Sequence, residues 1–110
     1  MNKALIIGRL GADPEIKLTT SGKTVCNLSI ATSESWTDKD GQKHEKTEWH
    51  KATCWDKPAE IISKYCKKGS QLAIEGKIQT RSWDDDHGNK RYSTEIAIQH
   101  FELLGGRQDG

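Results

Sequence analysis

The stretch TEWHKATCW, residues 47–55, alternates in a way that is typical of a β-strand. In a strand, successive side chains point to opposite faces. Trp49, Lys51 and Trp55 would then share one face, while small side chains such as Cys54 share the other. The aromatic rings thus lie with the charge. Most Trp residues pack in a core, so this stretch leaves two alternatives, an ordinary core face and an exposed aromatic surface.

Four further segments carry strand patterns around this stretch. They are apolar and β-branched or alternate between polar and apolar residues. Their sequences are KALIIGRL (3–10), TVCNLSIATS (24–33), SQLAIEGKIQTRSW (70–83) and RYSTEIAIQHFELL (91–104). In the second of them we expect Cys26, Leu28 and Ile30 to point inward. The polar segments TDKDGQKHEK and DDDHGNK contain turn-forming residues and predict two hairpin loops.

One segment, DKPAEIISKYCKKG at 56–69, predicts a helix. Pro58 suits the first turn, Asp56 can cap it, and Gly69 can adopt the left-handed conformation that ends it. Three- and four-residue spacings predict one apolar stripe. Its members are Ile61, Ile62, Tyr65 and Cys66.

Three strands, a helix and two strands indicate a fold class. We expect an all-β protein, a five-stranded antiparallel Greek-key barrel of the OB type, with one α-helix between the third and fourth strands. Residues 1–105 would form this domain, and 106–110 a flexible C-terminal end.

Composition limits the classes of function. A chain of 110 residues is one domain, and its net charge of +1 gives no overall basic field, so positive charge must be segregated locally. Three cysteines without metal-ligand spacing favour reduced thiols and neither a disulfide framework nor a metal site. The apolar run near the N-terminus is too short for a signal peptide or membrane span. We expect a soluble cytoplasmic protein with no membrane association and no cofactor.

The aromatic pattern recurs on the segment 70–83, where Trp83 shares a face with Arg81, and Trp36 adjoins a polar loop. Exposed Trp residues are costly for solubility, so a partner explains them best. Bases offer flat π-faces, and each base stacked on an aromatic ring contributes about 1–3 kcal/mol regardless of sequence. Duplex DNA hides those faces. The pattern therefore predicts binding of single-stranded nucleic acid by aromatic rings interleaved with cations.

Several blocks resemble a known family. NKALIIGRLGADPEIK, ATSESW, TEWH, GSQLAIEGKIQTRSW and RYSTEI together closely resemble the bacterial single-stranded DNA-binding protein (SSB) family over essentially the whole chain. The resemblance implies an OB-fold homotetramer that wraps single-stranded DNA. It also implies a role in coating exposed strands in replication, recombination and repair, at the nucleoid.

The resemblance also assigns roles to residues. The family's stacking aromatics fall on Trp36, Trp49 and Trp83, and Trp55 stands where the family usually has Phe. His50 matches a position at the subunit interface. The matching cationic positions, where phosphate contacts are expected, are Lys3, Lys17, Lys51, Lys57, Lys68 and Arg81.

Three positions depart from the family pattern. Asp56 stands where Gly is frequent in the family. Gln79 stands where Arg is frequent, and this second difference removes one expected phosphate contact. The chain also stops at Gly110, where the family continues into a long tail with an acidic tip that recruits other proteins, so the resemblance leaves two alternatives, a truncated core and a tail-less member. Protein partners bound through such a tail are therefore doubtful.

Three other functions compete with this hypothesis. The segment DDDHG, 84–88, could bind a metal for phosphodiester hydrolysis, although the same residues are expected turn formers, and we predict no enzyme. A primosome-type or RNA-binding OB-fold protein would use the same aromatic and basic face. A structural subunit would bury the Trp residues between protomers.

Overall fold

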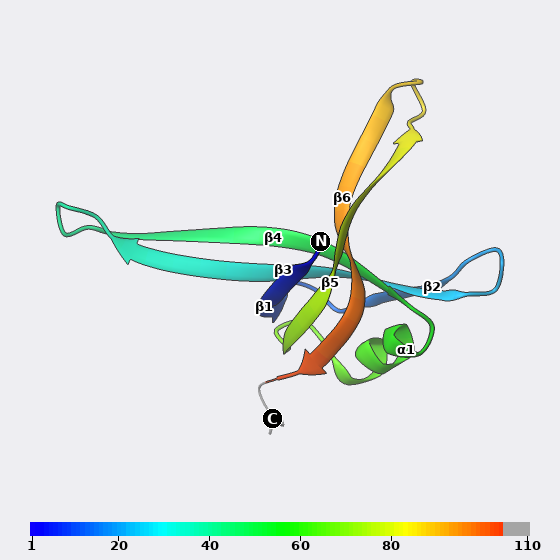
Figure 1. Ribbon diagram of the computed structural model, residues 1–110, viewed down its shortest axis with the longest axis horizontal. Coiled ribbons are helices and arrows are strands. Elements are labelled where there is room, and N and C mark those ends of the chain that lie inside the picture. The colour runs from blue at the N-terminus through cyan, green and yellow to red at the C-terminus, as the bar shows by residue number, and fades with distance from the viewer. Residues whose placement is uncertain (105–110) are drawn as a thin grey trace.

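A computed structural model describes residues 1–104 of the chain. Strands form most of it (Figure 1). The elements are β1 (Ala4–Leu10), β2 (Glu15–Leu18), β3 (Thr24–Thr37), β4 (Lys43–Trp55), α1 (Asp56–Tyr65), β5 (Gln71–Asp84) and β6 (Lys90–Leu103). The predicted flexible end at 106–110 lies outside the described residues. Within residues 1–104, no helix has the length and apolar character needed to cross a membrane.

The strands close into a barrel, which confirms the predicted OB-type fold. Their order is β1-β5-β6-β4-β3-β2, and an additional pairing of β1 with β3 closes the sheet. Two details of the prediction were wrong. β4 pairs with β6 in parallel, and the four-residue strand β2 was missed. Its sequence EIKL alternates polar and apolar residues, but four residues are too few to identify a strand, and all four side chains are exposed. With β2 counted, the helix lies between the fourth and fifth strands.

The core contains short or branched side chains and no Trp. Cys26, Leu28 and Ile30 all point inward from β3, as predicted. Gly76 of β5 is needed where the strands approach closely, because a Cβ there would collide with the backbone carbonyl oxygen of Ala97. The other strands and the helix supply the rest of the core. Its remaining members are Leu10, Ala52, Cys54, Ala59, Ile62, Cys66, Leu72, Ile74 and Ile96.

Two long hairpins leave the barrel in different directions (Figure 1). β3 and β4 stay paired to their ends, where Thr37 faces Lys43, so the prediction that these strands stop at 33 and start at 47 was wrong. Both faces of a two-stranded ribbon can carry polar residues, so the polar ends of β3 and β4 have the sequence character of a loop. Ile78 shares the face of β5 that carries the buried Leu72 and Ile74 but is itself exposed, because β5 has no β1 neighbour beyond Gly76.

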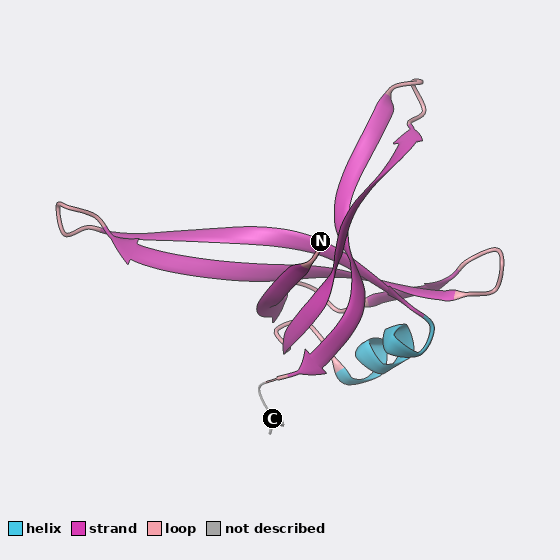
Figure 2. Ribbon diagram, viewed as in Figure 1, coloured by secondary structure: helices cyan, strands magenta, loops and turns pink. Residues whose placement is uncertain are grey.

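Helix α1 packs against β3, β4 and β2 (Figure 2). Trp55 occupies the N-cap position without a side-chain hydrogen bond, so the predicted Asp56 cap was wrong; Asp56 is the first helical residue, with φ of 60°. Gly69 has the expected positive φ, 91°, but four residues after the helix ends. Tyr65 is exposed, and the buried helical side chains are Ala59 and Ile62.

Candidate nucleic-acid interface

All four Trp side chains are exposed, so they are not part of the core. Trp36 is 47% exposed, Trp49 60%, Trp55 44% and Trp83 42%. Of the two alternatives left open by residues 47–55, the described chain therefore has the exposed aromatic surface.

Two of these rings lie on the outer face of the β3–β4 pair. Cross-strand partners share a face, and the register joins Ala31 to Trp49 and Val25 to Trp55. Lys51 and Thr53 fall between the two rings on that face. The Trp49 ring also packs directly against Gly11, where a Cβ would collide with it. A glycine at the end of β1 therefore leaves the space that this ring occupies.

A groove separates this outer face from the β5–β6 hairpin. Lys51 and Thr53 of β4 line one side of it, and Arg81 of β5 and Glu95 of β6 line the other. Its remaining lining residues come from the loop after β1, from β2, β3 and β4. They are Ala12, Asp13, Glu15, Asn27, Leu28, Ser29 and Ala52. Two predicted phosphate-binding cations, Lys51 and Arg81, are thus brought to one groove.

Arg81 is held in place by two neighbours. Its Nε–H donates a 2.9 Å hydrogen bond to Oε2 of Glu95, and the Ser93 hydroxyl donates to the same oxygen at 3.0 Å. The guanidinium carbon lies 4.8 Å from the ring centroid of Trp83, a cation–π geometry. Arginine and indole are therefore presented together, at the side of the groove.

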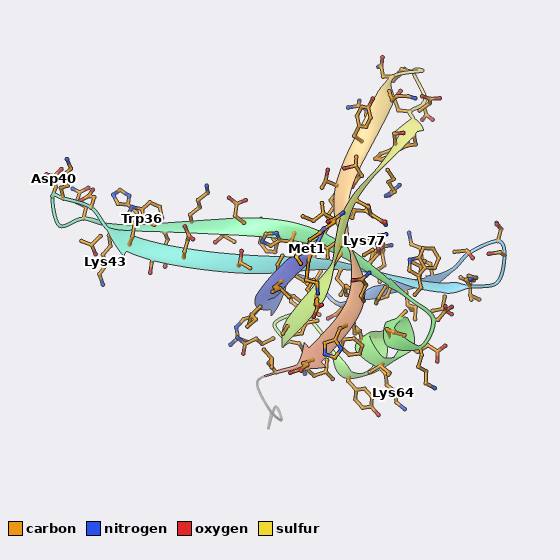
Figure 3. All side chains as sticks on the ribbon, viewed as in Figure 1. Met1, Trp36, Asp40, Lys43, Lys64 and Lys77 are labelled. Atoms are coloured by element: carbon orange, nitrogen blue, oxygen red, sulfur yellow. The ribbon has the colours of Figure 1, made fainter. Side chains whose placement is uncertain are left out.

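The β3–β4 tip presents the third aromatic group, Trp36, close to the turn (Figure 3). Its ring stacks on His44, with 5.4 Å between centroids and 19° between planes. His44 was expected to be a loop residue, but it is part of β4 and faces Trp36 in register. Its Nε2 lies 2.7 Å from Oδ2 of Asp38. By strand alternation, Trp36 is on the face of the ribbon opposite to Trp49.

The carboxylate of Asp38 organises that turn. Its Oδ1 accepts hydrogen bonds from the backbone N–H groups of Asp40 and Gln42, both at 2.9 Å. The hydrogen bond with His44, and after it the bond from Gln42, lowers the pKa of Asp38 below its ordinary value. A charged carboxylate therefore holds both the turn and the imidazole.

The β5–β6 tip is built in the same way. Oδ1 of Asp85 accepts from the backbone N–H groups of His87 and Asn89, and Oδ2 accepts from Arg91 Nε, all at 2.9 Å. The backbone bond from Asn89, and then the Arg91 bond, lowers the pKa of Asp85. This carboxylate of the DDDHG segment is thus engaged in the turn. Among residues 1–104, no group of three or more potential metal ligands lies together.

The other predicted cations are more scattered. Lys3 forms an ion pair with Glu75 at 2.7 Å. Lys17 of β2 is the cross-strand partner of Val25, and Val25 is the cross-strand partner of Trp55. The three residues therefore lie in one row across the sheet. Lys57 is in the first turn of α1, and Lys68 follows the helix, where its backbone N–H donates to Asp13. The structure thus brings Lys17, but not Lys3, to the neighbourhood of a Trp.

His50 is half-buried, on the opposite face of β4 from Trp49 and Lys51, and its Nε2 lies 2.9 Å from the Thr32 hydroxyl. The cysteines are all free and buried, with Cys26 facing Cys54 across β3–β4. The hydrogen bond with Cys26, together with burial, raises the pKa of the Cys54 thiol. None of these four side chains lines the groove.

Three functional features were missed in the sequence. Glu95 gave no signal, because a Glu in an alternating strand is usually exposed. The stacked pair of Trp36 and His44 was hidden by reading the segment as a loop. The third feature is a repeat: WTDKDGQKH (36–44) and WDDDHGNKR (83–91) both place Trp first, Asp third, Gly sixth and a basic residue ninth.

A small closed barrel with exposed indole rings and cations beside a groove defines an OB-type nucleic-acid-binding domain. Comparison with known proteins then gives the family. The chain belongs to the Single-strand binding protein family, whose sequence profile matches residues 1–104.

Individual relatives agree with this assignment. The chain is 49% identical, over 111 aligned residues, to Single-stranded DNA-binding protein 1 of Chlorobaculum tepidum, covering all of this chain and 68% of that protein. The structure resembles the Plasmodium falciparum SSB in complex with ssDNA, with a TM-score of 0.84, 32% identity, and coverage of 94% of this chain and 95% of the other. It also resembles a deletion mutant of the Thermus aquaticus single-stranded DNA-binding protein, with a TM-score of 0.82, 28% identity, and coverage of 97% and 52%.

Proposed function

We propose that this protein binds single-stranded DNA with little sequence preference and protects it in replication, recombination and repair. Bases stack on Trp36, Trp49, Trp55 and Trp83. Phosphates are neutralised by Lys3, Lys17, Lys51, Lys57, Lys68 and Arg81. The family, and a relative that was solved with single-stranded DNA, support this proposal.

The observation that carries the proposal is the exposure of four indole rings, three of them beside Lys or Arg side chains. An exposed Trp is unfavourable in water, and stacking on a base returns about 1–3 kcal/mol per ring. Lys51 lies between Trp49 and Trp55 on one face of β4, and Arg81 lies over the Trp83 ring. A chain of stacked bases with phosphates between them matches this alternation of ring and cation. The chemistry is that of binding, and we propose no catalytic step.

We propose that the working form is a homotetramer in the bacterial cytoplasm. Leu5 and Ile7 of β1 are both exposed on the outside of the barrel, an apolar surface that favours association. The half-buried His50 is proposed to lie at a subunit interface. Several copies would join their grooves into one DNA path and raise the effective concentration of the second contact.

A competition assay tests the proposal. A fluorescent dT oligonucleotide bound to the protein is challenged with equal lengths of unlabelled dT, mixed-sequence single strand, rU and duplex, and fluorescence anisotropy is followed. We expect both DNA single strands to displace the probe about equally, rU to do so less effectively, and duplex to fail. Displacement by duplex as readily as by single strand would refute base stacking. Stronger displacement by rU would support an RNA-binding OB-fold protein.

A further inference from the structure

Glu95 is a buried acid beside a groove that we propose to bind a polyanion. Glu95 is only 7% exposed, and Ser93 and Ile96 beside it are also buried, whereas the residues of β5 from Lys77 to Asp84 are all exposed. Burying a carboxylate is costly unless it is paired and hydrogen-bonded. Its negative charge would also repel phosphate in the groove that it lines. Simple electrostatics therefore makes Glu95 unfavourable for DNA binding, and its presence needs another explanation.

The contacts of Glu95 supply that explanation. Oε2 accepts the Nε–H of Arg81 at 2.9 Å and the Ser93 hydroxyl at 3.0 Å. Arg81 pairs with Ser93 across β5–β6, and Gln79 pairs with Glu95, so Arg81 and Glu95 are diagonal neighbours on one face. Their bond fixes a side chain that is otherwise 63% exposed and would sample many rotamers.

The fixed guanidinium serves two purposes. It covers one face of the Trp83 ring at 4.8 Å, which leaves the opposite face for a single base. Within residues 1–104, its only hydrogen bond is made through Nε, so both Nη groups remain available to a phosphate. A bidentate contact of this kind requires the planar fork of arginine in a set orientation.

We propose that Glu95 is a positioning residue for single-stranded DNA. It aims Arg81 at a phosphate and holds it against Trp83, so that base and phosphate are bound by one preformed unit. This inference rests on the proposed function, and it adds a requirement for a negative charge at the binding surface.

The direction in which one substitution changes the DNA affinity tests this inference. Glu95→Gln keeps the shape of the side chain but removes its charge. If Glu95 were only a structural acid, its removal would strengthen binding of a polyanion. If it positions Arg81, binding of a dT oligonucleotide should weaken about tenfold, because a charge-assisted bond is replaced by a weaker neutral one. The slope of log affinity against log salt should also fall by up to about 0.7, the loss of one phosphate contact.

A matched control separates charge from position. Glu48 pairs with Lys46 at 3.1 Å, and both side chains are exposed. Glu48→Gln removes the same charge from a loose surface pair, and we expect its affinity to be equal to or slightly higher than that of the wild type. In an Arg81→Ala background, Glu95→Gln should cause no further loss, because the residue it positions is absent. Arg81→Lys, with Glu95 intact, should lose most of what Arg81→Ala loses.

Two results with the Glu95→Gln substitution would overturn the inference. In the first, the single variant binds dT as well as the wild type or better; in the second, the substitution weakens binding to the same extent in the Arg81→Ala background. Urea unfolding of each variant shows whether it is folded. If Glu95→Gln does not fold, Arg81→Lys provides the test, and full retention of its affinity would also overturn the inference. Failure of the wild type itself to bind dT would instead refute the proposed function.

Discussion

The two hairpins that leave the barrel have nearly the same tip but present their aromatic rings differently. In each, an Asp two residues after the Trp accepts two backbone N–H bonds and one bond from a basic side chain six residues later. On β3–β4 that basic residue, His44, stacks on Trp36. On β5–β6 it is Arg91, while the Trp83 ring is covered by Arg81.

The faces differ as well. By strand alternation, Trp83 is on the face of its ribbon that carries Arg81 and Glu95 beside the groove, whereas Trp36 is on the opposite face of β3–β4 from Trp49. The same turn therefore serves two purposes. One hairpin completes the groove, and the other extends the aromatic surface away from it. Turn chemistry fixes the tip, and strand register decides which way the ring faces.

The largest expected difference between the hairpins is in DNA affinity. Trp83→Ala should cost about 2–3 kcal/mol of binding free energy to a long dT oligonucleotide, because the ring and the Arg81 contact are lost together. Trp36→Ala should cost about 1 kcal/mol, since this ring already stacks on His44 and lies at the far end of its arm, away from the groove. Isothermal titration calorimetry measures both. A larger loss for Trp36→Ala would reverse our assignment of the two arms.

A second prediction concerns what the tips share. Gly41 and Gly88 have φ values of 81° and 79°, in the left-handed region that other residues enter at a cost. Gly41→Ala and Gly88→Ala should each destabilise their tip by about 1 kcal/mol. Amide hydrogen exchange at the strand ends should therefore accelerate about fivefold in each variant. Unequal acceleration would show that the two turns are not equivalent; Gly22→Ala, in the β2–β3 turn, serves as a control that leaves both tips unchanged.

A third prediction concerns acid pH. The pKa of Asp38 and that of Asp85 are both lowered in the folded protein, so each carboxylate adds stability at pH values above the ordinary carboxyl pKa of about 4. That contribution is lost as the pH falls through the lower, folded-state value. Both tips should therefore loosen in acid below about pH 4.

The causes of the two shifts differ, which sharpens the comparison. The His44 bond is the largest cause at Asp38, whereas the backbone of Asn89 is the largest cause at Asp85. His44→Ala should therefore remove the largest single cause of the lowered pKa of Asp38 and raise that pKa toward its ordinary value. Arg91→Ala should leave much of the Asp85 shift in place. Carboxyl-carbon NMR titration of the two variants measures both pKa values. An equal change at Asp38 and Asp85 would contradict the predicted difference.

The sequence predicted the barrel and the exposed rings for clear physical reasons. Inward alternation of Cys26, Leu28 and Ile30 marks a sheet with one buried face, and the shared face of Trp49 and Lys51 follows from the same period of two. The roles of the exposed Trp and Lys side chains in binding DNA remain a proposal. β2 was missed because its alternation, in EIKL, extends over only four residues.

The rest depended on contacts that no local pattern encodes. The burial of Glu95 depends on Arg81 and Ser93 of a neighbouring strand, and His44 stacks on Trp36 only because the strands extend past the barrel. The Asp56 cap failed because the chain enters α1 directly from β4, with Trp55 at the cap position. Long-range pairing in each case overrode the local preference.

The central claim is that the indole rings receive the bases of single-stranded DNA. Intrinsic Trp fluorescence during titration with oligo-dT, repeated with matched duplex and at two salt concentrations, tests it most directly. We predict strong quenching by the single strand alone, with log affinity falling by about 0.7 per phosphate neutralised for each unit of log salt. Unchanged emission at saturating oligonucleotide would mean that the rings meet another surface, such as a second protomer, and would contradict the account.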